Sequence, residues 1–284
     1  MNLQKVTNTL LEAVWINGEY VLNEHNLLFS QDGADTNYKS DSTTVTRVDL
    51  AVNDSLMYWA EQNNLGYVGE EGNGALDKEY VMYVDSIDGT IAFTRGMNTA
   101  TIIACILRMD GDYGVPIASI LHNPISGHTW FTDNGATTYM RGSVLEMRYR
   151  ETSTLKEVKE KIRTNLCVFP GASHNLGTVK QLIESDSRFS DQSMGAFGYG
   201  AGLICSGILD ATAIGATAAT ESAAMSLLVQ NAGGVACDLE GNPLLGFTFG
   251  EVRGKPDFVL PKGALFASNN DVAKSILDII EECN

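Results

Sequence analysis

Two aspartates, Asp85 and Asp88, stand three residues apart just after the apolar run of residues 80–84, and a glycine and a threonine follow them. A second acidic pair, Glu70 and Glu71, lies upstream between two glycines. Carboxylates concentrated at turns are unfavourable unless a positive group binds them. Mg²⁺ takes oxygen ligands and prefers one or two carboxylates together with substrate phosphates. The pattern therefore predicts a magnesium site that holds a phosphate.

The composition is typical of a globular protein with an acidic surface. Of the 284 residues, 44% are hydrophobic and 19% are charged, which is ordinary for a globular domain. The formal net charge is −16, and such a surface repels nucleic-acid backbones and anionic membranes. We therefore expect no nucleic-acid partner and no membrane partner. A small phosphorylated metabolite is still a suitable ligand, because bound Mg²⁺ would be the largest local charge.

The cysteines and the first residues predict a cytoplasmic protein. The five cysteines show no C-x-x-C spacing, which is typical of reduced thiols in a reducing compartment. The N-terminus lacks the basic and then apolar pattern of a signal peptide. The longest apolar runs, such as residues 101–107, are far too short to span a bilayer.

Hydrophobic periodicity predicts the elements of the first half of the chain. Apolar residues at three- and four-residue steps indicate a helix near the N-terminus, and Thr46 is placed to cap a second helix that includes Asp49. The polar residues 33–44 between them are typical of a mobile loop. Strand-like runs linked by tight turns then predict an antiparallel or mixed sheet as far as about residue 149.

The pattern changes to an alternation of strands and helices after the polar segment 151–161. Strands are predicted at residues 166–169, 209–214 and 264–267, and helices at residues 176–184, 198–206, 221–231 and 272–281. This alternation is typical of an α/β layer arrangement. We therefore expect an N-terminal α+β subdomain of residues 1–150 and a C-terminal α/β subdomain of residues 151–284.

Four motifs, in register along the chain, give it a resemblance to a known family. They are residues 45–49 ending in Asp49, the acidic pair after Gly69, the segment Asp-Ser-Ile-Asp-Gly-Thr at residues 85–90, and Glu221 followed after eleven residues by two glycines. On these motifs the chain resembles the inositol monophosphatase family. This family is part of the superfamily that includes fructose-1,6-bisphosphatases and 3′-phosphoadenosine-5′-phosphate phosphatases. The likeness covers nearly the whole chain.

The resemblance implies a Mg²⁺-dependent phosphomonoesterase with a layered αβαβα sandwich fold. By resemblance, the substrate is a small sugar, polyol or nucleotide phosphate, the protein forms a homodimer, and Li⁺ inhibits the enzyme. The resemblance also implies two or three Mg²⁺ ions. Their ligands would be Glu70, Asp85, the carbonyl of Ile87, Asp88 and Glu221.

The resemblance also assigns residues to catalysis and to substrate binding. Asp49 and Thr90 would orient the attacking water, with Glu70 as a further catalytic residue. Backbone N–H groups can hold a phosphate if a helix begins near Gly89 and Thr90. The implied phosphate or substrate contacts are Asp88, Gly89, Thr90, Gly195 and Ile214, with Lys39 as a possible loop contact.

Three departures from the family's pattern bear on activity and substrate. Ser86 stands where the family usually has proline, and Glu221 stands where it usually has aspartate. Ile214 takes the position at which inositol monophosphatases have a glutamate that contacts sugar hydroxyls. A buried apolar side chain cannot satisfy a polyol hydroxyl. This difference argues against myo-inositol monophosphate as the preferred substrate.

Other interpretations stay open at this point. The departures at Ser86 and Glu221 allow a non-catalytic metal or phosphate binder on the same fold. Retention of Asp49 and Thr90 favours the enzyme, because a binder has no need of a pair that orients water. Taken singly, each acidic motif is also explained by a solvated turn or by an Asx-capped turn. Asp49 could lie on an exposed face of its helix, and Lys39 could belong to a solvated loop.

Overall fold

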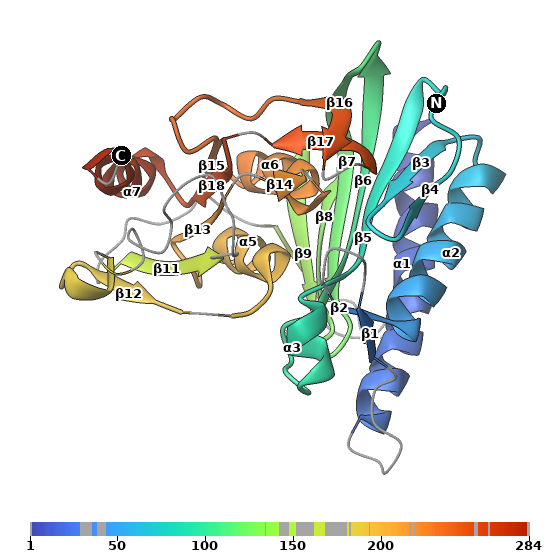
Figure 1. Ribbon diagram of the computed structural model, residues 1–284, viewed down its shortest axis with the longest axis horizontal. Helices are drawn as coiled ribbons and strands as arrows, with labels where there is room; N and C mark the ends of the chain where they lie inside the picture. Colours follow the sequence, from blue (N-terminus) through green and yellow to red (C-terminus); the bar gives the residue numbers. More distant parts are fainter. Residues whose placement is uncertain are drawn as a thin grey trace.

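The computed structural model consists of five layers, seen edge-on from right to left in Figure 1. Helices α1 (Leu3–Leu27) and α2 (Arg47–Gln62) form the first layer, and a large sheet forms the second. Helices α5 (Phe197–Cys205) and α6 (Thr220–Asn231) separate this sheet from a smaller one, which α7 (Asn270–Glu282) covers. This arrangement confirms the predicted αβαβα sandwich.

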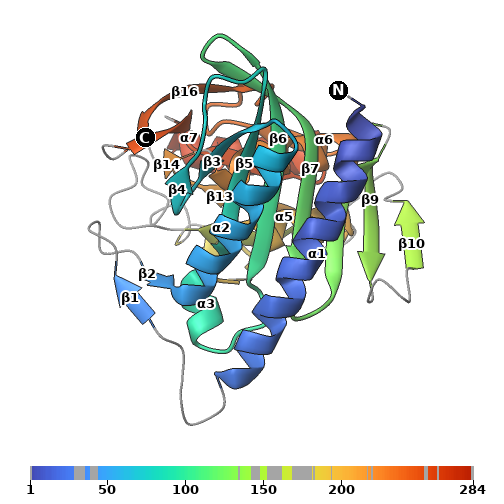
Figure 2. The same cartoon turned by 90° about the vertical axis from the view of Figure 1, so that its right-hand side faces the viewer.

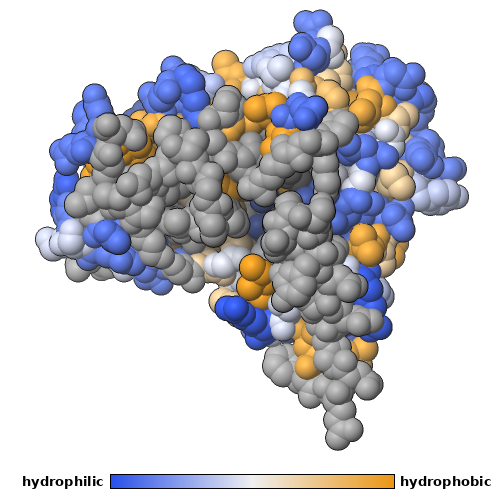
Figure 3. Space-filling view, viewed as in Figure 1, coloured by the Kyte–Doolittle hydropathy of each residue, from blue (hydrophilic) through white to orange (hydrophobic). Residues whose placement is uncertain are grey.

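The structure describes the chain with several gaps. The described residues are 2–28, 36–38, 44–133, 135–141, 148–151, 162–167, 181, 183–192, 194–215, 217–218, 220–252, 255–260 and 262–282. Within these ranges, no helix combines the length and the apolar character that crossing a membrane requires. On the face shown in Figure 3, hydrophilic residues form much of the coloured surface and hydrophobic ones occur in small groups.

Among the described residues, the large sheet has eleven strands, eight of them in the order β10-β9-β8-β7-β6-β5-β3-β4. In chain order these are β3 (Gly66–Gly69), β4 (Gly72–Asn73), β5 (Tyr80–Asp88), β6 (Thr101–Asp110), β7 (Tyr113–Asn123), β8 (His128–Asp133), β9 (Ala136–Arg141) and β10 (Arg148–Glu151). Three later strands join them: β14 (Thr217–Ala218), β16 (Phe247–Val252) and β17 (Lys255–Leu260). The pairings are antiparallel except for β3 with β5, which are parallel. The predicted mixed sheet is thereby confirmed.

In the part of the chain that the structure describes, the smaller sheet has five strands in the order β12-β11-β13-β18-β15. They are β11 (Ile162–Cys167), β12 (Phe189–Asp191), β13 (Ala211–Ile214), β15 (Val235–Cys237) and β18 (Ala264–Ala267). A separate two-stranded sheet pairs β1 (Thr36–Tyr38) with β2 (Thr44–Thr46). The short helix α3 (Thr90–Thr94) follows β5 directly.

The central strands of the large sheet, β5 and β6, are buried on both faces for most of their length, and this explains their long apolar runs. Successive side chains of a strand point to opposite faces, and a strand covered on both faces is apolar throughout. In β6, Ile102, Ala104 and Ile106 pack with α1 and α2 residues, whereas Ile103, Cys105 and Leu107 pack with those of α5 and α6. Figure 2 shows α1 and α2 side by side over one of these faces.

Most predicted helices and strands are present, with shifted ends. The predicted loop of residues 33–44 is wrong for 36–38 and 44, which belong to strands β1 and β2, while 33–35 and 39–43 lie outside the described residues. The predicted helix 176–184 lies largely outside them as well. Strands β14, β16 and β17 were not predicted, and they place residues of the second half in the first sheet. The division at residue 150 stays a prediction.

Candidate active site

The parallel pairing of β3 and β5 brings two acidic segments to one edge of the sheet. Gly69 pairs with Val84, and the Glu70 backbone N–H donates to the Val84 carbonyl at 3.1 Å. The turn after β3 therefore lies beside Asp85. A Cβ atom on Gly69 would stand 2.4 Å from Oδ1 of Asn53 on α2. Glycine at this position thus allows the turn that holds Glu70 to pack directly on the helix.

An irregularity in β5 separates Asp85 from Asp88. Asp85 pairs with Ile103 and Asp88 with Thr101, so two residues of β5 oppose one residue of β6. Such a bulge bends the strand and redirects its side chains. Oδ1 of Asp85 accepts a hydrogen bond from the Ile87 backbone N–H at 3.0 Å. The bulge therefore sets how the two carboxylates of the motif are presented.

Asp88 caps helix α5, which lies far from it in the sequence. Its Oδ1 accepts from the Phe197 N–H at 3.0 Å, and its Oδ2 accepts from the Gly198 N–H at 2.8 Å. Oδ2 also accepts from the Thr101 hydroxyl at 2.9 Å. The N-cap residue of α5, Ala196, has no side-chain acceptor of its own. A carboxylate is favourable at a helix N-terminus, so this contact fixes α5 against β5.

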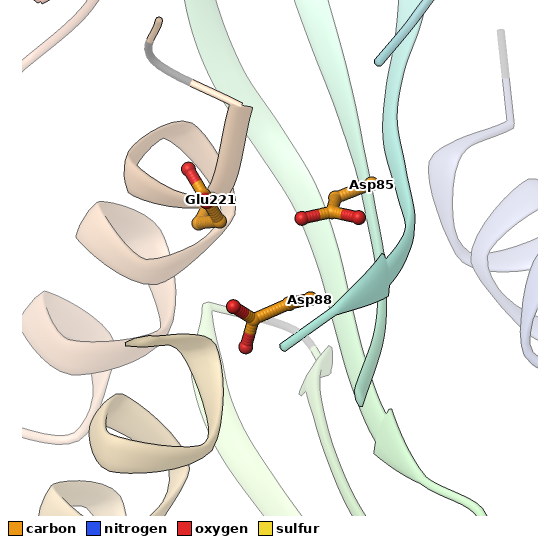
Figure 4. A group of neighbouring side chains, drawn as sticks. All are labelled: Asp85, Asp88 and Glu221. Carbon is orange, nitrogen blue, oxygen red and sulfur yellow. The ribbon is translucent and has the colours of Figure 1, made fainter. Parts of the chain in front are cut away.

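Glu221 meets Asp85 and Asp88 from the first turn of α6. Figure 4 shows the three side chains between strand β5 and helix α6. One carboxylate oxygen from each residue lies within 4.8 Å of those of the other two. Asp85 and Asp88 are buried and Glu221 is half-buried. In the described part of the chain, no ion pair involves any of the three.

Burial and mutual repulsion raise the pKa values of these carboxyl groups. The pKa of Asp88 rises to about 6 and that of Glu221 to about 8, in both cases chiefly because burial disfavours the charged form. The pKa of Asp85 lies well above its usual range for the same reason, and Glu70 adds repulsion. Such a group of oxygen donors fits a hard divalent cation such as Mg²⁺, whose charge would offset the repulsion.

Asp49 and Thr90 form a hydrogen-bonded pair. The Thr90 hydroxyl lies 3.1 Å from Oδ1 of Asp49 and 3.0 Å from the Ile87 carbonyl oxygen, and it donates its single proton to one of them at a time. Oδ2 of Asp49 accepts from the backbone N–H of Thr46 at 2.8 Å and from its hydroxyl at 2.5 Å. Asp49 is only 1% exposed, so the alternative of an exposed helix face is wrong.

Asp49 also completes a capping box at the start of α2. The Thr46 hydroxyl accepts from the backbone N–H groups of Val48 and Asp49, as the sequence predicts for this helix start. The pKa of Asp49 is raised, mainly by burial, while its hydrogen bonds with Thr46 and Thr90 act in the opposite direction. The helix cap therefore holds the carboxylate in one orientation toward Thr90.

The other predicted site residues are Gly89 with its neighbours, Ile214 and Lys39. Gly89 is the N-cap of α3, which begins at Thr90, as the predicted phosphate cradle requires. Gly89 has φ 82°, and a Cβ atom there would lie 2.8 Å from the Ala196 Cβ atom, beside Gly195. Ile214 is 1% exposed and belongs to the core between the two sheets. Lys39 lies outside the described residues.

Comparison with known proteins decides the family. A family model described as the inositol monophosphatase family matches residues 2–283. The chain belongs to this family. Family membership and curated relatives identify it as a phosphatase of the inositol monophosphatase superfamily, a phosphoric monoester hydrolase. The family is metal-dependent, and the cluster of Asp85, Asp88 and Glu221 is the candidate metal site of this member.

Two curated relatives are named for different activities. The 3′(2′),5′-bisphosphate nucleotidase CysQ of Aggregatibacter actinomycetemcomitans is 23% identical over 262 residues, which cover 87% of this chain and 93% of the relative. The probable inositol 1-monophosphatase ImpA of Mycobacterium tuberculosis is 26% identical over 214 residues, which cover 72% of this chain and 75% of the relative.

Solved structures of family members share the fold. The extragenic suppressor protein SuhB of Bartonella henselae superposes with a TM-score of 0.78 at 15% identity, covering 98% of this chain and 99% of that one. Inositol monophosphatase-II of Staphylococcus aureus with bound 2′-AMP has a TM-score of 0.68 at 20% identity, covering 98% and 95%. The same S. aureus protein has also been solved with inositol monophosphate.

In this inositol monophosphatase family member, Asp257 on β17 lies near the acidic cluster but was not predicted from the sequence. The Tyr83 hydroxyl donates a short hydrogen bond to Oδ1 of Asp257, and the Phe258 backbone N–H donates to the same oxygen at 2.7 Å. The Asp257 carboxylate also contributes to the raised pKa of Glu221. No motif or spacing marks Asp257 in the sequence, because its nearness to the site depends on how β17 pairs.

Proposed function

We propose that this phosphatase is a Mg²⁺-dependent phosphomonoesterase that hydrolyses a small sugar, polyol or nucleotide phosphate. One observation supports this most directly. Asp85 and Asp88 of β5 meet Glu221 of α6, with carboxylate oxygens mutually within 4.8 Å. The hydrogen-bonded pair of Asp49 and Thr90 belongs to the same group, because Asp49 adds to the repulsion that raises the pKa of Asp85. This combination favours an enzyme over a non-catalytic binder.

The proposed Mg²⁺ ligands, for two or three ions, are the four carboxylates and one carbonyl named by the resemblance. Asp85, Asp88 and Glu221 form the compact cluster. The negative charge of Glu70 repels the carboxylates of Asp85 and Glu221 and helps to raise their pKa values. The Ile87 carbonyl oxygen has two lone pairs, so its contact with Thr90 leaves one for a cation. When bound, paired divalent ions polarise the phosphoryl group and stabilise the leaving oxygen.

The protein's own groups would position water and phosphate. Asp49 is held by its helix cap and has Oδ1 directed at Thr90. When the Thr90 hydroxyl donates its proton to Asp49, its oxygen can accept a hydrogen bond from the attacking water and so orient that water. The N–H groups of Gly89 and Thr90 would hold the phosphate, with Gly195 alongside and Lys39 as a possible loop contact.

The substrate is proposed to be less hydroxylated than myo-inositol monophosphate. CysQ acts on nucleotides by its name, and the S. aureus relative has been solved with both 2′-AMP and inositol monophosphate. Ile214 is buried in the core, where it offers no group to a polyol hydroxyl. These observations favour a nucleotide or another less hydroxylated leaving group.

Four further properties are part of the proposal. We expect a cytoplasmic homodimer with two subdomains meeting near residue 150, and inhibition by Li⁺. Millimolar LiCl with a matched NaCl control tests the last of these. Equal rates in the two salts would show that the metal pocket differs from that of lithium-sensitive members.

Phosphate release across a panel of substrates tests the proposed function. The panel holds sugar, inositol, histidinol and adenosine phosphates, each measured in EDTA and after Mg²⁺ is restored. We expect turnover only with Mg²⁺ and slower release from inositol monophosphate than from the best substrate. Full activity in EDTA would contradict the metal assignment. Absence of turnover on every ester, together with intact folding, would favour the non-catalytic alternative.

A further inference from the structure

The hairpin of strands β16 and β17 lies in the large sheet between β7 and β14, the strand that leads to the start of helix α6. On one side of the hairpin, Phe247 and Thr248 of β16 pair with Gly114 and Tyr113 of β7. On the other side, β17 pairs with β14, which ends at Ala218, just before α6 begins. Glu221 lies in the first turn of α6. The position of this hairpin on the sheet therefore sets the point from which Glu221 extends.

Asp257 attaches the same hairpin to β5 beside the acidic cluster. Its Oδ1 accepts from the hydroxyl of Tyr83, and the Tyr83 ring packs on the Phe258 ring at 5.0 Å between centroids. Tyr83 is fully buried. It stands two residues before Asp85 on β5, and residues at this spacing share a face of a strand. The hydrogen bond thus ties β17 to the face of β5 that presents Asp85.

We propose that Asp257 is a positioning residue of the metal site: by accepting the Tyr83 hydrogen bond it fixes the hairpin, and through β14 the start of α6, so that Glu221 faces Asp85 and Asp88. This inference rests on the proposed function, in which those three carboxylates bind a divalent cation. Mg²⁺ requires oxygen ligands in nearly ideal octahedral geometry. A small displacement of one ligand therefore weakens cation binding even when the fold is intact.

If Asp257 positions Glu221, removing its hydrogen bond with Tyr83 should weaken cation binding even where the melting temperature changes little. Asp257→Ala and Tyr83→Phe each remove the hydrogen bond, one from each partner. Asp257→Asn keeps an Oδ1 acceptor for Tyr83 while it removes the charge. A control, Glu251→Gln, removes an exposed charge from β16 of the same hairpin.

Binding of Mn²⁺, measured by the electron paramagnetic resonance of the free ion, gives the test independently of turnover. We expect Asp257→Ala and Tyr83→Phe each to weaken Mn²⁺ binding about tenfold, the scale of one lost hydrogen bond to a charged group. The double variant should lose little more than either single one, because both remove the same bond. Asp257→Asn should stay within about threefold of the wild type, and Glu251→Gln should match it.

Melting temperatures of the same proteins separate positioning from simple support of the fold. Lower melting temperatures with wild-type Mn²⁺ affinity in both Asp257→Ala and Tyr83→Phe would overturn the inference. Loss of affinity in Asp257→Asn as large as in Asp257→Ala would also overturn it, since charge rather than the hydrogen bond would then matter. Failure of the wild-type protein to bind Mn²⁺ would instead overturn the proposed function, and this inference with it.

Discussion

Asp88 combines a role in the fold with its proposed role in the metal site. Its two oxygens accept hydrogen bonds from the backbone N–H groups of Phe197 and Gly198 and from the Thr101 hydroxyl, and this fixes α5 on β5. An asparagine side chain has only one acceptor oxygen. Whichever way the amide faces, it places an N–H₂ group against a donor. Replacing Asp88 by asparagine keeps the size of the side chain, but it therefore affects both packing and charge.

Asp88→Asn is thus expected to lower stability as well as activity. The unmatched donors should reduce the free energy of unfolding by about 1–3 kcal/mol, and loss of a ligand charge should remove most Mg²⁺-dependent turnover. Chemical denaturation and phosphate release measured on one preparation check both effects. Wild-type stability would contradict the capping role, and wild-type turnover would contradict the ligand role.

Thr90 offers the cleanest test of the water-orienting pair, because Asp49 also caps α2. Thr90→Ala should reduce kcat about 10²-fold, the usual scale for lost acid–base positioning, with a smaller change in KM. Thr90→Ser should retain most activity. Thr94→Ala is a matched control, since the Thr94 hydroxyl donates to a carbonyl of the same helix at 3.0 Å. Normal kcat in Thr90→Ala would remove the residue from the mechanism.

Ser86 bears on how firmly the motif is held. Its side chain is buried, and its hydroxyl has no hydrogen-bond partner among the described residues. A buried hydroxyl without a partner is unfavourable by about 1–3 kcal/mol. Ser86→Ala should therefore raise the melting temperature by about 2 °C and leave kcat unchanged. A lower melting temperature would show that the hydroxyl is satisfied within the folded protein.

At the scale of elements, the site depends on where α6 starts. Strand β14 pairs with Leu260 and Val259 of β17, and Glu221 follows within the next few residues. With the backbone held in this way, the length of the side chain at position 221 decides whether its carboxylate reaches Asp85 and Asp88. The glutamate is one methylene longer than the aspartate that the family usually has there.

Glu221→Asp is expected to withdraw the carboxylate from the cluster. Mg²⁺ needs its ligand oxygens near 2.0–2.1 Å, so half-saturating Mg²⁺ should rise and turnover should fall by about tenfold or more. Glu240→Asp, an exposed change at a residue that pairs with Lys262, serves as control. Mg²⁺ titrations of the three proteins on one substrate decide the matter. A large gain in Glu221→Asp over an inactive wild type would indicate a pseudophosphatase.

At the scale of the whole molecule, the acidic cluster couples stability to pH. Folding raises the pKa of Asp88 from 3.8 to about 6 and that of Glu221 from 4.5 to about 8. At these two carboxyl groups, the folded protein therefore binds more protons than the unfolded chain between about pH 4 and pH 8. Stability falls with rising pH wherever the folded state holds the extra protons.

In EDTA, the melting temperature should accordingly be lower at pH 8 than at pH 5. Added Mg²⁺ should raise it more at pH 8, where the carboxylates are ionised and the repulsion is greatest. Glu221→Gln should flatten the dependence in EDTA, because it removes the group with the higher of the two pKa values. Scanning calorimetry with and without Mg²⁺ checks this. A Mg²⁺ effect that is larger at pH 5 would contradict a cation site at these carboxylates.

Local signals in the sequence were enough to predict several helices and strands and the motifs of the site. The apolar run of β6, the Thr46 cap of α2 and the spacing of α7 follow from burial on a face and from hydrogen bonds within a few residues. The order of the acidic motifs was sufficient to suggest the family, and the family implied the layered αβαβα sandwich. Exact ends shifted because they depend on neighbouring elements.

Which segments meet in the fold could not be predicted from local patterns. The parallel pairing that sets Glu70 beside Asp85, the capping of α5 by Asp88 and the burial of Asp49 all join residues far apart in the chain or depend on what covers them. The hairpin that brings Asp257 to Tyr83 has no periodic or motif signal. Periodicity records that a side chain is buried, whereas its partner is fixed by long-range packing, which a local pattern does not contain.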